Sequence, residues 1–217
     1  MGIEENIKKI LKDIPEEVKV IAVSKTKPIE DMNKVYDLGL RDFGENKVQE
    51  FLYKFENFKK DVKWHLIGHL QTNKVKYIVG KVELIQSLDS IKLLKEIEKV
   101  YSNHNVIANT LLQINIGREQ QKYGVLEEDI KSILEYVEKC NFVKIKGIMV
   151  IIPKGTEAEN SLYFKKTHDI WSNLKFKKYK NVTMEILSMG MSNDYHEAIK
   201  NGSNMIRVGT GIFGKRN

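Results

Sequence analysis

A short apolar run that ends in a lysine lies near the start of the chain: Val20-Ile21-Ala22-Val23-Ser24-Lys25-Thr26-Lys27-Pro28. Three of its first four residues are β-branched, which predicts a buried strand. Polar residues end the strand, and Pro28 suits the first turn of a helix. The pattern therefore puts Lys25 at the carboxyl end of a buried strand.

A lysine at this position has two interpretations. Burial disfavours the ammonium form and lowers the pKa, which makes Lys25 a candidate nucleophilic amine that forms a Schiff base with a carbonyl compound. The alternative is an ordinary strand-end lysine whose ammonium group reaches solvent. Taken by itself, the stretch favours the alternative, because most lysines are solvated.

Similar apolar runs recur along the chain and alternate with segments that carry one apolar face at helical spacing. We expect strands at residues 19–24, 42–44, 64–68, 84–87, 111–115, 144–150, 184–188 and 205–208. We expect helices at residues 2–12, 28–38, 47–58, 72–80, 91–101, 127–139, 157–174 and 193–200.

Strands that alternate with helices predict a parallel sheet. With 217 residues, the chain is near the lower end of length for a (β/α)₈ barrel, which we expect together with an extra N-terminal helix. A doubly wound open sheet is the alternative. No linker, low-complexity stretch or clear repeat interrupts the chain, so we expect residues 1–217 to form a single α/β domain.

The composition excludes several classes of protein. No run of 18 apolar residues is present, so no membrane-spanning helix is expected, and the acidic N-terminus lacks the layout of a signal peptide. Cys140 is the only cysteine, which rules out an internal disulfide and suits the cytoplasm. The net charge is +7, but acidic residues are mixed among the lysines, so we expect small anionic ligands and not nucleic acid or a membrane as partners.

Small and polar residues follow the last two predicted strands. Ser192 is placed to cap the helix at 193–200, and Gly209 and Thr210 add backbone N–H groups and a hydroxyl. In barrels of this type, loops after the seventh and eighth strands usually bind phosphate. A carbonyl-seeking Lys25 and a phosphate site at one rim suggest pyridoxal 5′-phosphate (PLP), and Arg207 is placed to reach its ring.

Two further side-chain patterns have ordinary structural explanations. His65 and His69 are four residues apart, but they lie on a strand and loop and not on one helix face, so we expect no metal site. Lys27 is a second lysine that an aldehyde can reach, but we favour a solvated lysine at the start of a helix.

The chain resembles the pyridoxal phosphate homeostasis proteins over nearly its whole length. The resemblance rests on residues 22–28, Phe43-Gly44-Glu45-Asn46, Trp64-His65-Leu66-Ile67-Gly68-His69-Leu70-Gln71, Asn115-Ile116-Gly117-Arg118-Glu119, Leu187-Ser188-Met189-Gly190-Met191-Ser192 and Ile206-Arg207-Val208-Gly209-Thr210. His69 and Asn193 differ from the proline and aspartate of many members.

The resemblance implies a barrel similar to the N-terminal domain of alanine racemase. It implies Lys25 as the Schiff-base residue, with Asn46 also at the cofactor site. It points to Ser192, Gly209 and Thr210 for the phosphate and to Arg207 near the pyridine nitrogen.

Two functions remain, a PLP-binding protein and an amino-acid racemase of the same fold. Racemases of this type add a C-terminal β-domain, for which this chain has no room, and an arginine at the pyridine nitrogen weakens carbanion chemistry. Tyr123 is the only tyrosine near the rim loops, and we expect it to pack at a helix start. We therefore expect a non-catalytic, monomeric protein that stores, buffers or delivers PLP, with apo PLP-dependent enzymes as candidate recipients.

Overall fold

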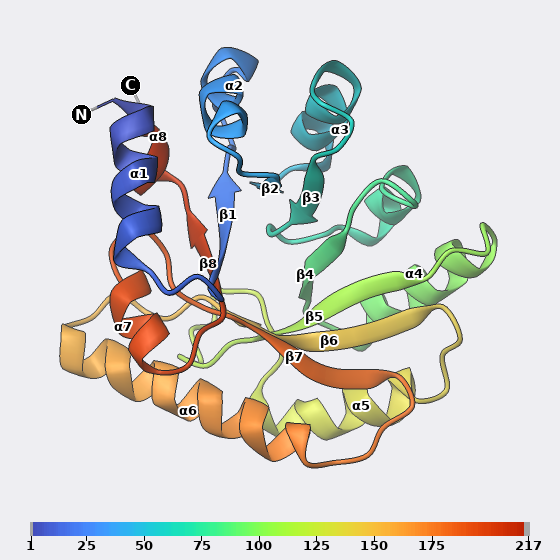
Figure 1. The fold of residues 1–217 in the computed structure, drawn as a ribbon. Coiled ribbons are helices and arrows are strands. Elements are labelled where there is room, and N and C mark those ends of the chain that lie inside the picture. Colours follow the sequence, from blue (N-terminus) through green and yellow to red (C-terminus); the bar gives the residue numbers. More distant parts are fainter. Residues whose placement is uncertain (1, 215–217) are drawn as a thin grey trace.

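Eight parallel strands close into a barrel in the computed structural model, which describes residues 2–214 (Figure 1). The strands are Lys19–Val23 (β1), Asp42–Glu45 (β2), Lys63–Leu66 (β3), Leu84–Leu88 (β4), Ala108–Ile114 (β5), Val143–Val150 (β6), Val182–Ser188 (β7) and Met205–Val208 (β8). The first and last strands pair, with Ile21 beside Arg207 and Ala22 beside Val208. The predicted barrel is confirmed, and the open-sheet alternative is wrong.

Helices follow the strands and surround the barrel (Figure 1). The α-helices are Ile3–Asp13 (α1), Ile29–Asp37 (α2), Val48–Asn57 (α3), Ile91–Ser102 (α4), Ile130–Val137 (α5), Glu157–Lys175 (α6), Tyr195–Lys200 (α7) and Thr210–Phe213 (α8). Two 3₁₀ helices, Thr72–Tyr77 (η1) and Glu127–Asp129 (η2), complete the set in the described residues. None of these helices is both long and apolar enough to cross a membrane.

Three helices differ from the sequence prediction. The segment expected as an α-helix at 72–80 is the shorter 3₁₀ helix η1. Helix α7 begins at Tyr195 and not at 193, because the Asp194 carboxylate accepts the Met191 N–H at 2.6 Å and holds the preceding residues in a turn. The short helix α8 was not expected at all.

The barrel has two apolar layers. Most buried side chains lie between the sheet and the helices, where alternation along each strand sends every second residue outward. A smaller cluster joins residues of β1, β4, β5, β6 and β8: Ile21, Leu84, Leu111, Met149 and Met205. Because these strands lie on different sides of the closed sheet, this cluster fills the barrel interior.

Helices α1 and α8, the first and the last in the described residues, lie side by side next to this barrel (Figure 1). Helix α1 lies next to α8 in Figure 1, and Asn6 Nδ2 donates to the Ile212 carbonyl at 3.0 Å. The β1–β8 pairing therefore lies under a helix pair built from the first and last described residues.

Candidate functional site

Lys25 lies where the sequence predicts it, just past the carboxyl end of β1. Val23 ends the strand, Ser24 is fully buried, and Lys25 is half-buried. Thr26 then has a positive φ of 64°, and Pro28 is the residue that precedes α2. The chain thus turns sharply at Lys25, from a buried strand toward a helix on the outside of the barrel.

A buried ion cluster from β2 and α3 holds the backbone on both sides of Lys25. Lys54 Nζ donates to the Ser24 carbonyl at 2.7 Å and to Glu45 Oε1 and Glu50 Oε1, both at 2.8 Å. Glu50 also accepts the Thr26 N–H at 2.5 Å. The residues on either side of the lysine are therefore fixed by side chains of two neighbouring elements.

The electrostatics of this cluster follow from its burial. Glu45 is 0% exposed and Lys54 is 3% exposed. Burial raises the pKa of Glu45, although the charge and hydrogen bond of Lys54 oppose the shift. This cluster is not predicted from the sequence. Its one signal was the i,i+4 spacing of Glu50 and Lys54, which is common on exposed helix faces and does not indicate burial.

The turn that begins α8 meets the loop after β7. Ser192 Oγ accepts the Gly209 N–H at 3.3 Å and the Gly211 N–H at 3.0 Å. The expectation that Ser192 caps the helix at 193–200 is wrong: its hydroxyl caps the amides that open α8, and Asp194 precedes α7. Ser192, Gly209 and Thr210 are nevertheless brought together, as the sequence predicts.

The turn at Gly209 also lies against β1. A Cβ atom on Gly209 would approach Val23 to 3.4 Å, so a side chain here would press on the end of β1. Since Lys25 comes two residues after Val23, the lysine and the α8 turn project from neighbouring strand ends.

Arg207 is buried in the barrel near the same rim, with only 4% of its surface exposed. Its two η-nitrogens donate to uncharged acceptors at the ends of β7 and β6, Ser188 Oγ at 2.6 Å and the Val150 carbonyl at 2.7 Å. Burial lowers the pKa of the guanidinium to about 10, although the charge of Asp194 opposes the shift. The guanidinium is therefore a buried cation held by neutral partners.

Asn46 and Lys27 complete the predicted set. Asn46 follows β2 and is half-buried, and a Cβ at Gly68 would collide with its backbone, so the end of β3 packs closely against it. Lys27, expected to be solvated, is half-buried and donates to the Phe213 carbonyl at 3.3 Å.

The histidines and Tyr123 occupy different places. His65 lies in the barrel interior at 2.9 Å from Asp42, whereas the His69 ring contacts Asp89 at 2.6 Å and stacks on Tyr123 with ring centroids 3.7 Å apart. Tyr123 is 57% exposed, so the expectation that it packs at a helix start is wrong. Within residues 2–214, no cluster of three or more histidine, cysteine or acidic side chains is arranged to hold a metal.

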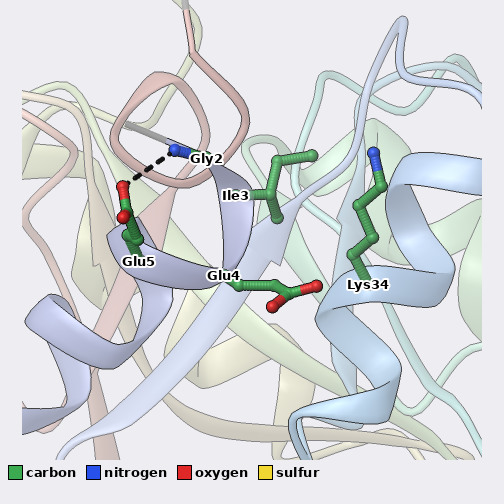
Figure 2. Close-up of a pocket in the computed structure, with 5 residues that line it drawn as sticks. All are labelled: Gly2, Ile3, Glu4, Glu5 and Lys34. Carbon is green, nitrogen blue, oxygen red and sulfur yellow. Dashed lines mark hydrogen bonds between the residues drawn. The ribbon is translucent and has the colours of Figure 1, made fainter.

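A surface hollow elsewhere does not include the predicted residues. Figure 2 shows it at the start of α1, lined by Gly2, Ile3, Glu4, Glu5 and, from α2, Lys34. The Gly2 N–H donates to Glu5 at 3.2 Å across its edge. Since its walls come from helices outside the sheet, the hollow is separate from the strand ends that carry Lys25 and Arg207.

Nearly the whole chain is similar to known proteins. Residues 2–217 match the family model described as the N-terminal domain of alanine racemase. A pyridoxal phosphate homeostasis protein of Aquifex aeolicus is 44% identical over 200 residues, which cover 91% of this chain and 87% of that protein.

Solved structures are also similar to this chain over nearly its whole length. PipY of Synechococcus elongatus superimposes with a TM-score of 0.92 in its structure without PLP, at 33% identity over 98% of this chain and 100% of that one. Its structure with PLP bound gives a TM-score of 0.90 at 32% identity over the same shares.

Proposed function

This chain belongs to the family of pyridoxal phosphate homeostasis proteins, and we propose that it binds PLP and acts in PLP homeostasis. In this proposal residues 1–217 act as one cofactor-binding domain. Lys25 joins the cofactor as a Schiff base, Ser192, Gly209 and Thr210 bind the phosphate, Asn46 lines the site, and Arg207 faces the pyridine nitrogen.

One observation carries the proposal: three groups that suit three parts of PLP lie where the first and last strands pair. Lys25 extends from the end of β1, and Arg207 and the Gly209 turn belong to β8 and its end. An amine suits the aldehyde, backbone amides suit a phosphate, and a guanidinium suits a ring nitrogen that accepts a hydrogen bond.

The described residues fit this cofactor in charge and hydrogen bonding. In the turn at Gly209 the amides of Gly209 and Gly211 both donate to Ser192 Oγ. A phosphate bound there would replace that oxygen as the acceptor of the two amides and would accept the Ser192 hydroxyl hydrogen as well. Arg207 is a buried cation with neutral acceptors, and desolvated charges of this kind are costly unless further hydrogen bonds satisfy them. An acceptor on a ligand would satisfy it.

When bound, PLP supplies an aldehyde and an aromatic ring that can withdraw electrons. The residues of this chain limit the second property. An arginine donates a hydrogen bond but does not give up its proton near neutral pH, and the pKa of Arg207 is still about 10. The ring nitrogen therefore stays unprotonated and withdraws electrons weakly, which supports a carrier without strong catalysis over an amino-acid racemase.

The proposal is tested by absorbance. Purified apo protein titrated with PLP should gain a band at the border of the visible and near-ultraviolet, and borohydride should abolish this band and label Lys25, as read by peptide mass spectrometry. Lys25→Ala should lose the band, whereas Lys27→Ala should keep it and serves as the matched control. A full borohydride-sensitive band in Lys25→Ala would contradict the assignment of the Schiff base to Lys25, and Lys27 would be the next lysine to test.

We propose further that the bound cofactor passes to apo PLP-dependent enzymes and that the carrier is a monomer. Incubation of loaded protein with an apo transaminase should restore activity faster than the same PLP released freely through a dialysis membrane. Equal rates in the two arrangements would reduce the role to storage.

A further inference from the structure

A line of hydrogen-bonded polar side chains crosses the interior of the barrel from Arg207 toward the opposite end. Arg207 donates to Ser188 Oγ at 2.6 Å, and the Ser188 hydroxyl donates to Gln86 Oε1 at 2.7 Å. Gln86 Nε2 lies 3.2 Å from His65 Nδ1, and His65 Nε2 lies 2.9 Å from Asp42 Oδ1. The line therefore joins β8, β7, β4, β3 and β2 through side chains alone.

The middle of this line is shielded from solvent. Ser188 and Gln86 are 0% exposed and His65 is 2% exposed, while Asp42, at the amino-terminal end of β2, is partly exposed and pairs with Lys19 at 3.4 Å. Bulk water thus cannot replace a missing partner in the middle of the line, so each polar group there depends on its neighbour.

The bonds all run in one direction. The single hydroxyl hydrogen of Ser188 goes to Gln86, so its oxygen lone pair is free to accept from Arg207. The Gln86 amide nitrogen is a donor, so His65 Nδ1 accepts and its Nε2–H donates to Asp42. Rotating the Gln86 amide by half a turn would bring its nitrogen to Ser188 and leave the Ser188 hydrogen without this acceptor.

Asp42 fixes the far end of the line. Burial raises the pKa of Asp42, but the hydrogen bond from His65 and the charge of Lys19 outweigh burial and lower it overall. Asp42 is therefore a carboxylate that accepts the His65 hydrogen, which selects the tautomer that the rest of the line requires.

We propose that Gln86 and His65 are positioning residues for Arg207, which act through Ser188 to fix the guanidinium against the pyridine nitrogen of bound PLP. Each member sets the rotamer or hydrogen direction of the next, so the ring partner is oriented from inside the barrel. The inference rests on the proposed function, since it assigns the ring nitrogen to Arg207. Ile, Leu and Met side chains of the interior cluster pack in the same barrel interior as the line that ends at Arg207.

Gln86→Met tests this without touching the rim, because it keeps the length of the side chain and removes the hydrogen bonds with Ser188 and His65, together with a third from Gln86 Nε2 to Met205 Sδ. Thr110→Val is the matched control: Thr110 is also 0% exposed, and its hydroxyl donates to the Lys144 carbonyl, outside the line. Both proteins are loaded with PLP, and three quantities are measured: the absorbance maximum, the PLP dissociation constant and the melting temperature of the apo form.

We expect Gln86→Met to shift the absorbance maximum and to weaken PLP binding about tenfold, the usual effect of one lost hydrogen bond to a charged group. Borohydride should still label Lys25, and Thr110→Val should keep the wild-type spectrum and affinity. A purely structural role for Gln86 would lower the melting temperature but leave the spectrum of the loaded protein unchanged.

The outcomes separate this inference from the proposed function. Wild-type spectrum and affinity in Gln86→Met, with a normal borohydride-sensitive band, would overturn the inference alone. Absence of that band in the wild-type protein would overturn the proposed function and the inference together. If Gln86→Met does not fold, Ser188→Ala breaks the line one link nearer to Arg207, and the same spectral comparison decides.

Discussion

Replacing Lys54 by methionine removes the cation at the centre of the buried cluster behind Lys25. The ammonium group makes three hydrogen bonds, to the Ser24 carbonyl, Glu45 and Glu50. Methionine fills a similar volume but leaves the Glu45 carboxylate buried without its cation. Ser24 Oγ still donates to Glu45 Oε1 at 2.6 Å, which satisfies only part of that charge.

The expected loss follows from the burial of both partners. Since Lys54 is 3% and Glu45 is 0% exposed, solvent screens this pair very little, and breaking such a pair from one side costs about 3–5 kcal/mol of unfolding free energy. In a domain of this size that loss lowers the melting temperature by about 6–20 °C. Lys54→Met combined with Glu45→Gln should recover part of the loss, because the unpaired charge is gone.

The loss should also depend on pH with a defined sign. Burial already raises the pKa of Glu45 in the folded protein, and removing Lys54 takes away the main opposing attraction, so the folded pKa lies further above the unfolded one. The protonated carboxyl is then favoured by folding. The stability of Lys54→Met relative to wild type should therefore improve as the pH falls toward the ordinary glutamate value of about 4.3 and worsen as it rises.

Urea unfolding followed by far-ultraviolet circular dichroism, at neutral and acidic pH, measures these differences. Lys131→Met is the matched control, since Lys131 and Glu135 form an i,i+4 pair at 3.8 Å that is largely exposed, and no measurable change is expected. The reasoning is refuted if Lys54→Met is as stable as Lys131→Met, or if Glu45→Gln gives no recovery in the double variant.

Two further predictions concern the cofactor site. Pyridoxal without phosphate should bind much more weakly than PLP, because each charge-assisted hydrogen bond from Ser192 or the α8 amides contributes about 1.5–3 kcal/mol. Equal affinities for the two compounds in parallel titrations would contradict the assignment of the phosphate site to this turn. The PLP-loaded protein should not exchange the α-proton of L-alanine into deuterated water at enzyme-like rates, because in the proposed assignment Arg207 faces the ring nitrogen and would keep it unprotonated. Exchange at about 1 s⁻¹ or faster, followed by proton NMR, would restore the racemase hypothesis.

The strand pattern predicts most of the fold because it depends on local signals. β-Branched runs such as residues 20–23 are buried on both faces of the sheet in a parallel barrel, so a strand can be predicted from such a run without knowing which strands pair with it. The positions of three site residues can be predicted for the same reason, since Lys25, Arg207 and Gly209 each lie at the end of a predicted strand. The first residue of α7 cannot be predicted in this way, because it depends on the hydrogen bond that the Asp194 side chain accepts from a neighbouring backbone amide.

The hydrogen-bonded line and the Lys54 cluster could not be predicted from the sequence. His65, Gln86 and Ser188 come from three separate strands, and nothing in their local sequence tells which side chains face each other inside the barrel. Lys54 lies on a helix with ordinary amphipathic spacing, where lysine is usually solvated. Tertiary packing alone decides that these polar groups are buried together.

The pairing of β1 with β8 also has a consequence for the order in which the protein is made. Synthesis delivers Lys25 long before Arg207 and the turn at Gly209, because β1 and β8 are far apart along the chain and yet pair in the sheet. Until then β1 is an unprotected sheet edge, and a reactive amine there would have no phosphate or ring partner beside it. In the proposed assignment, the groups that would hold the aldehyde, the phosphate and the ring nitrogen therefore come together only after β8 has been synthesised and has paired with β1.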